Sequence, residues 1–307
     1  MKIAVTGGTG FVGGYVVNEL LRRGHEVRVV ARRPDEARSR FNRPVPAEPG
    51  SVSDVDSLRR AFAGVDAIVH LVGIINESEG VSFDAVHRQG TENVVAAART
   101  AGARRLVHMS AMGSAPDAPS EYSRTKAAGE EAARRSGLEA TVFRPSIIFG
   151  PGDGFVTLLA RIVRANPGFI PVIGPGTVRF MPVSVREVAR VFADAFDKAE
   201  SIGKVFEVGG PETLTMNEIY REIAAAVGKP RKPLVHFPLW YGRILAAAMA
   251  VLPDPPLTAD QLRSLSRDNV GDISATTAVF GPPATRFADG IREYVHAKSR
   301  HDPRIGI

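Results

Sequence analysis

The sequence predicts an α/β fold, a doubly wound parallel sheet with helices on both faces and a smaller C-terminal lobe. Short apolar, often β-branched segments alternate with segments of helical period through the first half of the 307 residues. A glycine-rich turn follows the first apolar segment and opens the first helical pattern. After Gly150 the alternation stops, and prolines punctuate a loop-rich stretch.

The pattern of apolar residues places each element of the first half. Strands are expected at 3–6, 26–30, 67–72, 105–109 and 140–148, with a further short one at 45–47 although prolines disfavour it. Helices are expected at 11–23, 54–63, 87–100 and 121–135. Gly24 is placed to end the first helix, while Ser53-x-x-Asp56 and Thr215-x-x-Glu218 resemble capping boxes.

The second half contains fewer regular elements. Helices are expected at 154–165, 185–196 and 216–227, with a short strand at 204–208. We therefore divide the chain into two parts. The first is a domain, 1–150, that parts of 176–208 complete, and the second, 151–307, mainly forms a second lobe.

Composition excludes several classes of function. The chain has no cysteine, which removes disulfides, thiolate zinc sites and a cysteine nucleophile, and its seven histidines lack metal-ligand spacing, so no metal is expected. The net charge of +6 comes without a long basic block, so no nucleic-acid partner is expected. No secretion signal precedes the first strand, which predicts a cytoplasmic protein.

An apolar segment at 239–252 is shorter than the roughly 20 residues that span a bilayer. We favour a core helix of the second lobe for it. The alternative is an amphipathic helix that lies on a membrane, in a protein peripheral to it, or lines a quinone-like pocket.

The glycine-rich turn comprises Thr6-Gly7-Gly8-Thr9-Gly10-Phe11-Val12-Gly13. Gly7 permits a tight turn, Gly10 lets backbone amides approach a diphosphate, and Gly13 lets the helix pack closely on the strand. The amide groups and the positive end of the helix then face phosphates. The turn predicts a dinucleotide site.

The residues after the second strand indicate which dinucleotide binds. An NAD site usually has an acidic side chain there, but this chain has Arg32 and Arg33, and its first acid is Asp35. A guanidinium binds a 2′-phosphate through paired hydrogen bonds. We therefore predict NADP.

Tyr122 and Lys126 lie four residues apart in a helical pattern and share one helix face. A phenol with a pKa near 10 is a poor acid–base catalyst at neutral pH, and a nearby ammonium lowers that pKa. Tyr122 would then donate a proton to a carbonyl oxygen as hydride arrives, and Lys126 would also hold the nicotinamide ribose.

These motifs resemble the extended or atypical short-chain dehydrogenase/reductase superfamily. The resemblance rests on TGGTGFVG, HLVG, GTENVVAAA, YSRTK and RPSIIFGPGD, and it extends through FMPVSVREVARVF and VFEVGGPETLTMNEI. The chain is most similar to the group that includes the nucleotide-binding accessory subunit of mitochondrial complex I and its bacterial relatives. This resemblance implies a Rossmann-type sheet and a C-terminal substrate lobe, with a small-molecule substrate in the cleft between them.

The resemblance also implies individual cofactor contacts. Together with Thr9, Gly13 and Arg33 of the motifs above, the cofactor-binding residues are expected to be Gly7, Gly10, Phe11, Val12, Arg32, Ser51, Val52, Leu71, Val72, Gly73, Lys126, Pro145 and Ile148.

Three positions depart from the family pattern. Ser110 fills the role of the active-site hydroxyl in one register, but a shift of one residue puts Ala111 there; His87 replaces a common asparagine, and Ser51 replaces a common aspartate. The leading hypothesis is an NADP-dependent oxidoreductase that transfers hydride to a small carbonyl or quinone-like substrate, with Tyr122, Lys126 and Ser110 catalytic. The alternatives are a cofactor-loaded, non-catalytic accessory or assembly subunit of a respiratory complex, bound to a membrane-associated protein, and an epimerase or dehydratase with tightly held cofactor.

Overall fold

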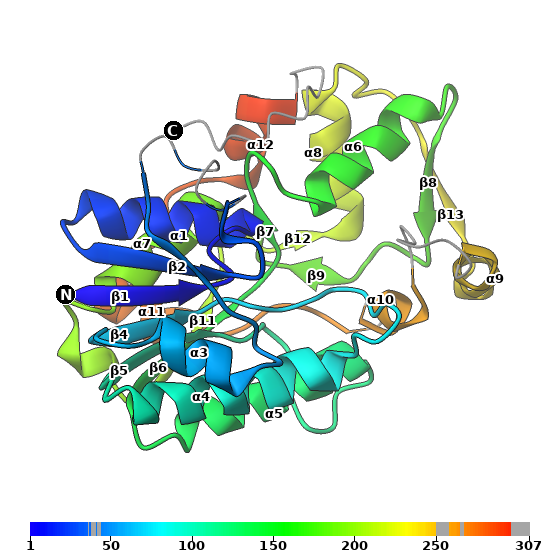
Figure 1. Cartoon of the computed structure of the whole chain (residues 1–307). Coiled ribbons are helices and arrows are strands. Elements are labelled where there is room, and N and C mark those ends of the chain that lie inside the picture. Colours follow the sequence, from blue (N-terminus) through cyan, green and yellow to red (C-terminus); the bar gives the residue numbers. More distant parts are fainter. Residues whose placement is uncertain (36, 38–40, 42–43, 250–257, 265–266, 296–307) are drawn as a thin grey trace.

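A seven-stranded parallel sheet organises the first part of the chain (Figure 1). The computed structural model describes residues 1–35, 37, 41, 44–249, 258–264 and 267–295. The strands of the sheet are β1 (Lys2–Thr6), β2 (Glu26–Ala31), β3 (Ala47–Pro49), β4 (Ala67–His70), β5 (Arg105–Met109), β6 (Glu139–Pro145) and β11 (Val205–Val208). Their order is β11-β6-β5-β4-β1-β2-β3, and all neighbours are parallel. The predicted α/β class is confirmed.

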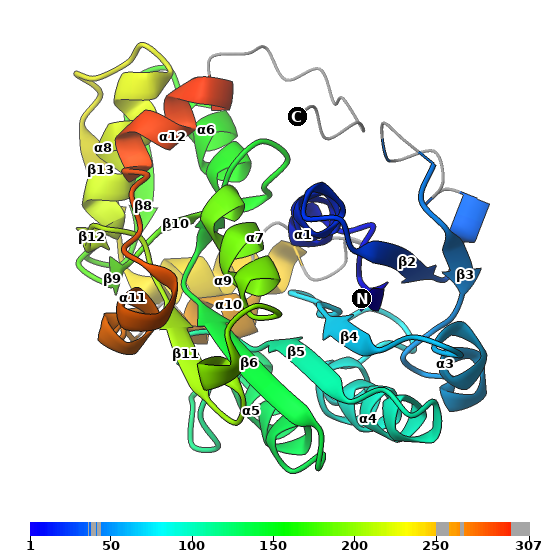
Figure 2. The same ribbon diagram turned by 90° about the vertical axis from the view of Figure 1, so that its left-hand side faces the viewer.

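Helices cover both faces of this sheet, as Figure 2 shows. On one face lie α1 (Phe11–Arg22) and α7 (Val185–Asp194), and on the other lie α3 (Val55–Ala61), α4 (Gly90–Thr100) and α5 (Glu121–Arg134). Alternate strand residues point to opposite faces, so Val5 joins the core under α1 while Ala4 joins the core under α4. The sheet is doubly wound and Rossmann-type, as the sequence predicts.

A third hydrophobic core lies beside the sheet. It gathers around α6 (Phe155–Ala165), α8 (Met216–Ala226) and α12 (Phe287–Val295). Three two-stranded sheets complete this part: β7 (Ile148–Phe149) with β10 (Val183–Ser184), β9 (Arg179–Phe180) with β12 (Leu214–Thr215), and β8 (Ile170–Ile173) with β13 (Leu234–Phe237). The remaining elements are η1 (Ala85–Gln89), η2 (Ala199–Ser201), α9 (Leu239–Met249), α10 (Ala259–Ser264) and α11 (Ser274–Phe280).

Three predicted strands differ from the observed bounds by two residues or more, and one of them, expected at 67–72, ends at His70. The third strand is β3, which begins at Ala47, because Pro46 lacks an N–H and only its carbonyl joins the ladder, accepting from the Val29 N–H at 2.8 Å. The strand expected at 140–148 is divided into β6 and β7, and β7 leaves the main sheet to pair with β10.

The helix-end signals are mostly confirmed. Gly24 follows α1 with φ of 81°, and Thr215 with Glu218 forms a complete capping box on α8. The Ser53-x-x-Asp56 box was wrong. The N-cap of α3 is Asp54, whose carboxylate accepts the backbone N–H groups of Asp56 and Ser57.

The helix at 239–249 is not the core helix that we favoured from the sequence. Its large apolar side chains face outward, and Trp240 is 61% exposed. Residues 250–252 of the predicted segment lie outside the described residues. In the described part of the chain, no helix has both the length and the apolar character needed to cross a membrane.

Candidate cofactor and active site

The glycine-rich loop joins β1 to α1 at the carboxyl edge of the sheet. Gly7 has φ of 76°, a left-handed conformation that favours glycine, and its carbonyl accepts the Gly10 N–H at 3.0 Å. A Cβ on Gly13 would lie 2.1 Å from the Gly7 oxygen, whereas a Cβ on Gly10 would meet only that oxygen, at 3.2 Å. The loop is therefore closely packed at Gly13 and open at Gly10, and α1 begins directly after it. This geometry fits a dinucleotide diphosphate.

The other predicted cofactor residues of this half also follow strand ends. Arg32 and Arg33 come directly after β2 and are exposed, and Arg32 makes no hydrogen bond or ion pair with the described residues. Ser51 lies just beyond β3, which pairs with β2, so the end of β2 and Ser51 lie at the same edge. Val52 is fixed by a hydrogen bond from Asn93 Nδ2 to its carbonyl at 2.8 Å.

The segment after β4 lies against the glycine-rich loop. A Cβ on Gly7 would lie 3.0 Å from the backbone of both Leu71 and Val72, so these chains are in close contact. Gly73, which is exposed, follows them. Thr9 of the loop, Phe11 and Val12 at the start of α1, Pro145 at the end of β6 and Ile148 at the start of β7 belong to the same carboxyl side of the sheet.

Tyr122 and Lys126 lie in the first two turns of α5. Ser120 caps this helix by accepting the Ser123 N–H. Lys126 is 4% exposed, and its Nζ donates to the carbonyl of Met109 at the end of β5. That Nζ is also 3.9 Å from the position of a Cβ on Gly73. Lys126 therefore connects α5, the end of β5 and the segment after β4.

In the chain without a bound dinucleotide, burial is the main cause of the pKa shifts of Tyr122 and Lys126. It lowers the pKa of Lys126 to about 8, an effect that nearby Glu130 opposes. It raises the pKa of Tyr122 to about 12. The expected lowering of the Tyr122 pKa is therefore wrong for the chain without a bound dinucleotide, because burial removes the solvent that would stabilise the phenolate. Tyr122 holds its proton at neutral pH and has the state of an acid.

His87 replaces the family's asparagine and connects two parts of the site. Its Nε2 accepts the Ile74 N–H at 3.1 Å, and its Nδ1 is 2.9 Å from Thr125 Oγ1 on α5. The imidazole also meets the Tyr122 ring edge-on, with centroids 5.3 Å apart. Burial and Lys126 lower the pKa of His87 to about 3, so the side chain is neutral. His87 braces the segment after β4 against the helix of Tyr122.

Two more histidines lie beneath the site, as the sequence predicts for strand residues. His70 and His108 are opposite each other on β4 and β5, with rings 5.2 Å apart. His70 Nδ1 is 2.7 Å from Thr6 Oγ1 and Nε2 is 3.2 Å from Thr91 Oγ1. Burial lowers the pKa of His70 to about 3 and also lowers the pKa of His108. Within the described residues, neither ring nitrogen of His108 has a partner.

Ser110 follows β5 and is 2% exposed. Its backbone N–H donates to the Phe143 carbonyl at 2.8 Å, whereas its Oγ has no hydrogen-bond partner in the described chain. A buried hydroxyl without a partner costs free energy, and it is a feature of sites built to bind another polar group. Ser110 thus places a hydroxyl directly after β5, and its role as the active-site hydroxyl stays a prediction.

Two residues of the second half hold the site, and the sequence analysis missed both. Asp260 on α10 accepts the backbone N–H groups of Glu121 and Tyr122 at 2.7 and 3.1 Å, so it caps α5 from a distant segment. Asn269 accepts from Ser146 Oγ at 2.6 Å and donates to the Met112 carbonyl at 2.9 Å. Only the spacing of Thr258 and Gln261, a helix-start signal, marks this region in the sequence.

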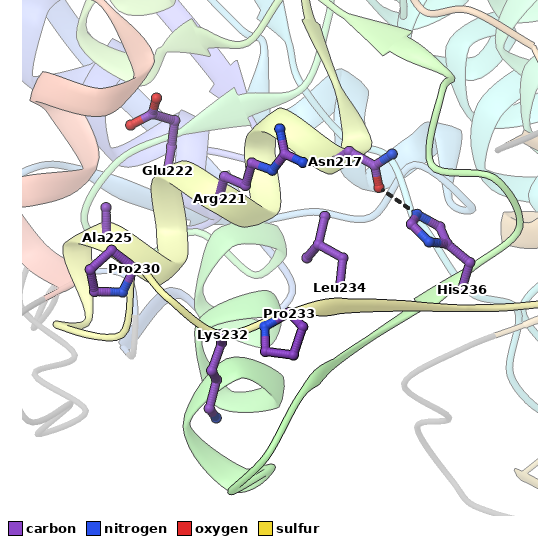
Figure 3. A pocket seen from close by; sticks show the side chains of 9 residues that line it. All are labelled: Asn217, Arg221, Glu222, Ala225, Pro230, Lys232, Pro233, Leu234 and His236. Atoms are coloured by element: carbon purple, nitrogen blue, oxygen red, sulfur yellow. Dashed lines mark hydrogen bonds between the residues drawn. The ribbon is translucent and has the colours of Figure 1, made fainter.

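The two described pockets lie elsewhere. One, of 460 Å³, is formed by α8, β13 and the chain between them. Figure 3 shows the residues that line it, among them His236, which is hydrogen-bonded to Asn217. The other, of 440 Å³, includes Met1 and Arg105 at the opposite edge of the sheet. Neither contains a predicted cofactor or catalytic residue, and the substrate cleft stays a prediction. Among the described residues, no cluster of three or more metal-ligating side chains occurs.

Comparison with known proteins identifies the family. The model of the NAD dependent epimerase/dehydratase family matches residues 3–209, which contain the glycine-rich loop, Tyr122 and Lys126. The chain belongs to this family. It is an NAD(P)-binding member of the extended short-chain dehydrogenase/reductase type, so the predicted family is confirmed.

Curated relatives include both reductases and a subunit of a larger assembly. The chain is 32% identical to a 2-alkyl-3-oxoalkanoate reductase of Stenotrophomonas maltophilia, with 95% of this chain and 98% of the relative covered. It is 30% identical to NADH dehydrogenase (ubiquinone) 1 alpha subcomplex subunit 9 of Arabidopsis thaliana, with 87% and 70% covered. These relatives support an oxidoreductase-type family member.

Solved structures show the same fold. UDP-glucose 4-epimerase of Thermotoga maritima, solved with UDP-glucose, has a TM-score of 0.73 at 22% identity, covering 96% of this chain and 97% of that one. DesIV, a dTDP-glucose 4,6-dehydratase of Streptomyces venezuelae solved with NAD, also has a TM-score of 0.73 at 22% identity, covering 96% of each chain.

Proposed function

We propose that this family member is an NADPH-dependent reductase of a carbonyl or quinone-like substrate. One observation carries the proposal: Lys126 Nζ binds the Met109 carbonyl and lies beside Gly73, so the Tyr122 helix adjoins the segment expected to line the cofactor. The unpartnered Oγ of Ser110, the residue after Met109, supports a polar group of a substrate at the same strand end. A dinucleotide, when bound, supplies the hydride.

The chain's own residues would then handle the proton. Tyr122 carries a proton at neutral pH, because its pKa is raised to about 12, and it donates this proton to the carbonyl oxygen as that oxygen gains negative charge. Lys126 adds a positive charge below its pKa of about 8 and favours the phenolate that remains. Ser110 Oγ donates a hydrogen bond to the same substrate oxygen. The protonated Tyr122 is therefore in the state that the reduction step requires at neutral pH.

The preference for NADPH rests on Arg32. Its guanidinium is exposed beside β2 and has no partner among the described residues, so it is free to bind a 2′-phosphate. Loss of an NADPH preference would remove this part of the proposal without affecting the reductase.

A substrate panel tests the reductase directly. Purified protein is mixed with NADPH and carbonyl compounds or quinones, including 2-alkyl-3-oxoalkanoates because a relative carries that activity in its name. We expect oxidation of NADPH with at least one compound. Tyr122→Phe should lower that turnover by about 10²- to 10⁴-fold and leave NADPH affinity unchanged. Full turnover by this variant would remove Tyr122 from the mechanism.

A second candidate is a cofactor-loaded accessory or assembly subunit that docks to a membrane-associated partner. The likeness to the NADH dehydrogenase subunit and the presence of His87 in place of asparagine favour it. The same panel separates the two candidates. Tight NADPH binding with no oxidation across the panel, together with a higher melting temperature, would support the accessory subunit.

A further inference from the structure

Helix α9 presents an apolar face at the outer end of the second lobe, at the far right of Figure 1. Trp240 is 61% exposed and Ile244 is 58% exposed, and Leu239 is 41% exposed. Soluble surface helices place such side chains against the core and polar ones in water. The described part of α9 has Arg243 as its one charged residue.

The packing of α9 explains why these large side chains face outward. A Cβ on Gly242 would lie 2.6 Å from Ile173 Cγ2 and 3.4 Å from Leu262 Cδ2, so the glycine lets α9 lie close to β8 and α10. Ala246, one turn later, is also buried. The inner face of α9 thus uses small residues, and its orientation leaves the large apolar side chains on the surface.

Aromatic side chains extend this surface onto the neighbouring β-ribbon. Tyr241 stacks on Phe237 with centroids 5.1 Å apart, and Phe237 is 6.3 Å from Phe169. Trp240 meets Tyr241 edge-on at 6.2 Å. We name as the aromatic patch the six residues Phe169, Phe237, Leu239, Trp240, Tyr241 and Ile244. A contiguous exposed apolar surface of this kind marks an interaction site.

The segment of the chain that carries most of the aromatic patch has charges of one sign. From residue 223 to residue 253 the sequence has no aspartate or glutamate, but it has Lys229, Arg231, Lys232 and Arg243. Lys229 and Lys232 bind main-chain carbonyls. Arg243, on α9 itself, is exposed and has no ion pair or hydrogen bond with the described residues. The patch therefore combines apolar and aromatic side chains with a free cation.

We propose that the aromatic patch docks on the surface of a bilayer that contains anionic lipids. Trp240 and Ile244 enter the boundary between headgroups and acyl chains, and Arg243 contacts lipid phosphates. A second copy of the chain fits less well, because a symmetric interface would place the Arg243 guanidiniums of both copies in one apolar interface, in a protein of net charge +6. Helix α10 packs on α9, and its Asp260 accepts the backbone N–H of Tyr122. Helix α10 therefore connects the docked surface to the helix of the proposed active site.

The only tryptophan of the chain reports on this docking directly. Trp240 is the single tryptophan in the sequence, so the intrinsic fluorescence of the unmodified protein comes from the aromatic patch. With vesicles of phosphatidylcholine and phosphatidylglycerol, we expect its emission to move to shorter wavelength and to be quenched by lipids brominated on their acyl chains. Pure phosphatidylcholine vesicles, or added salt, should weaken the effect. Unchanged emission with the anionic vesicles would overturn the proposal.

Variants separate docking from a general loss of folding. Ile244→Glu keeps Trp240 and should weaken vesicle partition by about tenfold or more, because a charge must enter the interface. Arg243→Gln should remove most of the preference for anionic lipid. The control is Ile202→Glu, which removes an exposed apolar side chain near the opposite edge of the sheet, and it should bind vesicles as the parent does. Equal loss in the control, or a dimer in sedimentation velocity that Ile244→Glu dissociates, would contradict membrane docking.

Discussion

His87 donates a hydrogen bond from Nδ1 to Thr125 Oγ1, over 2.9 Å, and its other ring nitrogen fixes this direction. The Ile74 N–H points at Nε2 at 3.1 Å, so Nε2 accepts and Nδ1 carries the proton. The Thr125 hydroxyl in turn donates a hydrogen bond to the carbonyl of Glu121 or Tyr122. A neutral imidazole in one tautomer is therefore built into the support of the proposed active site.

Acid should unfold the protein through its buried histidines. The pKa values of His70, His87 and His108 all lie below the ordinary 6.5, so the unfolded chain binds protons before the folded protein does. Stability is full above pH 6.5 and is lost as the pH falls toward 3. Three protons predict a slope on the order of 4 kcal/mol per pH unit in that window. Urea unfolding at several pH values measures it.

His108→Leu measures the contribution of one of these histidines to the pH dependence of stability. Because neither ring nitrogen of His108 has a partner in the described chain, leucine removes a buried polar group without breaking a bond. We expect a slope lower by about one proton and higher stability at pH 5. A slope unaltered by His108→Leu would contradict this account.

Two glycines of the loop should respond differently to alanine. Gly13→Ala forces a Cβ to within 2.1 Å of the Gly7 oxygen, so the loop must move and stability should fall by about 3 kcal/mol or more. Gly10→Ala has space except for that oxygen at 3.2 Å, so its stability should change by less than about 1 kcal/mol. Its Cβ nonetheless occupies the open side of the loop.

Dinucleotide titration distinguishes the two roles. Gly10→Ala should fold and bind NADPH at least about tenfold more weakly, because the backbone amides no longer reach the diphosphate. Equal NADPH affinity in the parent and in Gly10→Ala would show that the diphosphate lies elsewhere.

Arg32 should select the phosphorylated cofactor. Arg32→Ser removes the guanidinium that we expect on the 2′-phosphate, and loss of such a charged hydrogen bond costs about 1.5–3 kcal/mol. NADPH affinity should fall by about ten- to hundredfold while NADH affinity stays the same. Competition between 2′,5′-ADP and 5′-ADP measures the preference without turnover. A parallel loss of affinity for both would mean that Arg32 supports the loop rather than the phosphate.

Sequence patterns predicted the parts of this molecule that depend on near neighbours in the chain. Strand periodicity and the glycine spacing gave the sheet, and the four-residue spacing put Tyr122 and Lys126 on one face of α5. The predictions that were wrong, and the residues that were missed, depend on packing between segments far apart in the sequence. Asp260 caps α5 from 138 residues away, and burial raises rather than lowers the pKa of Tyr122. The orientation of α9 is set by contacts of Gly242 that periodicity does not encode.

The buried ammonium of Lys126 should lower the free energy of unfolding, although the proposed reaction requires it. Burial lowers its pKa from 10.5 to about 8, so the folded protein carries a cost below pH 10.5 that is complete below pH 8. Lys126→Met removes that cost together with the bond to the Met109 carbonyl, and should raise the free energy of unfolding at pH 7 by about 1–3 kcal/mol. The gain should shrink as the pH approaches 10.5, and carbonyl reduction should be lost. Denaturant unfolding at pH 7 and pH 10 without added dinucleotide measures this, with Lys198→Met, whose side chain is 42% exposed, as the control. A less stable Lys126→Met at pH 7 would mean that the ammonium's contacts outweigh its burial.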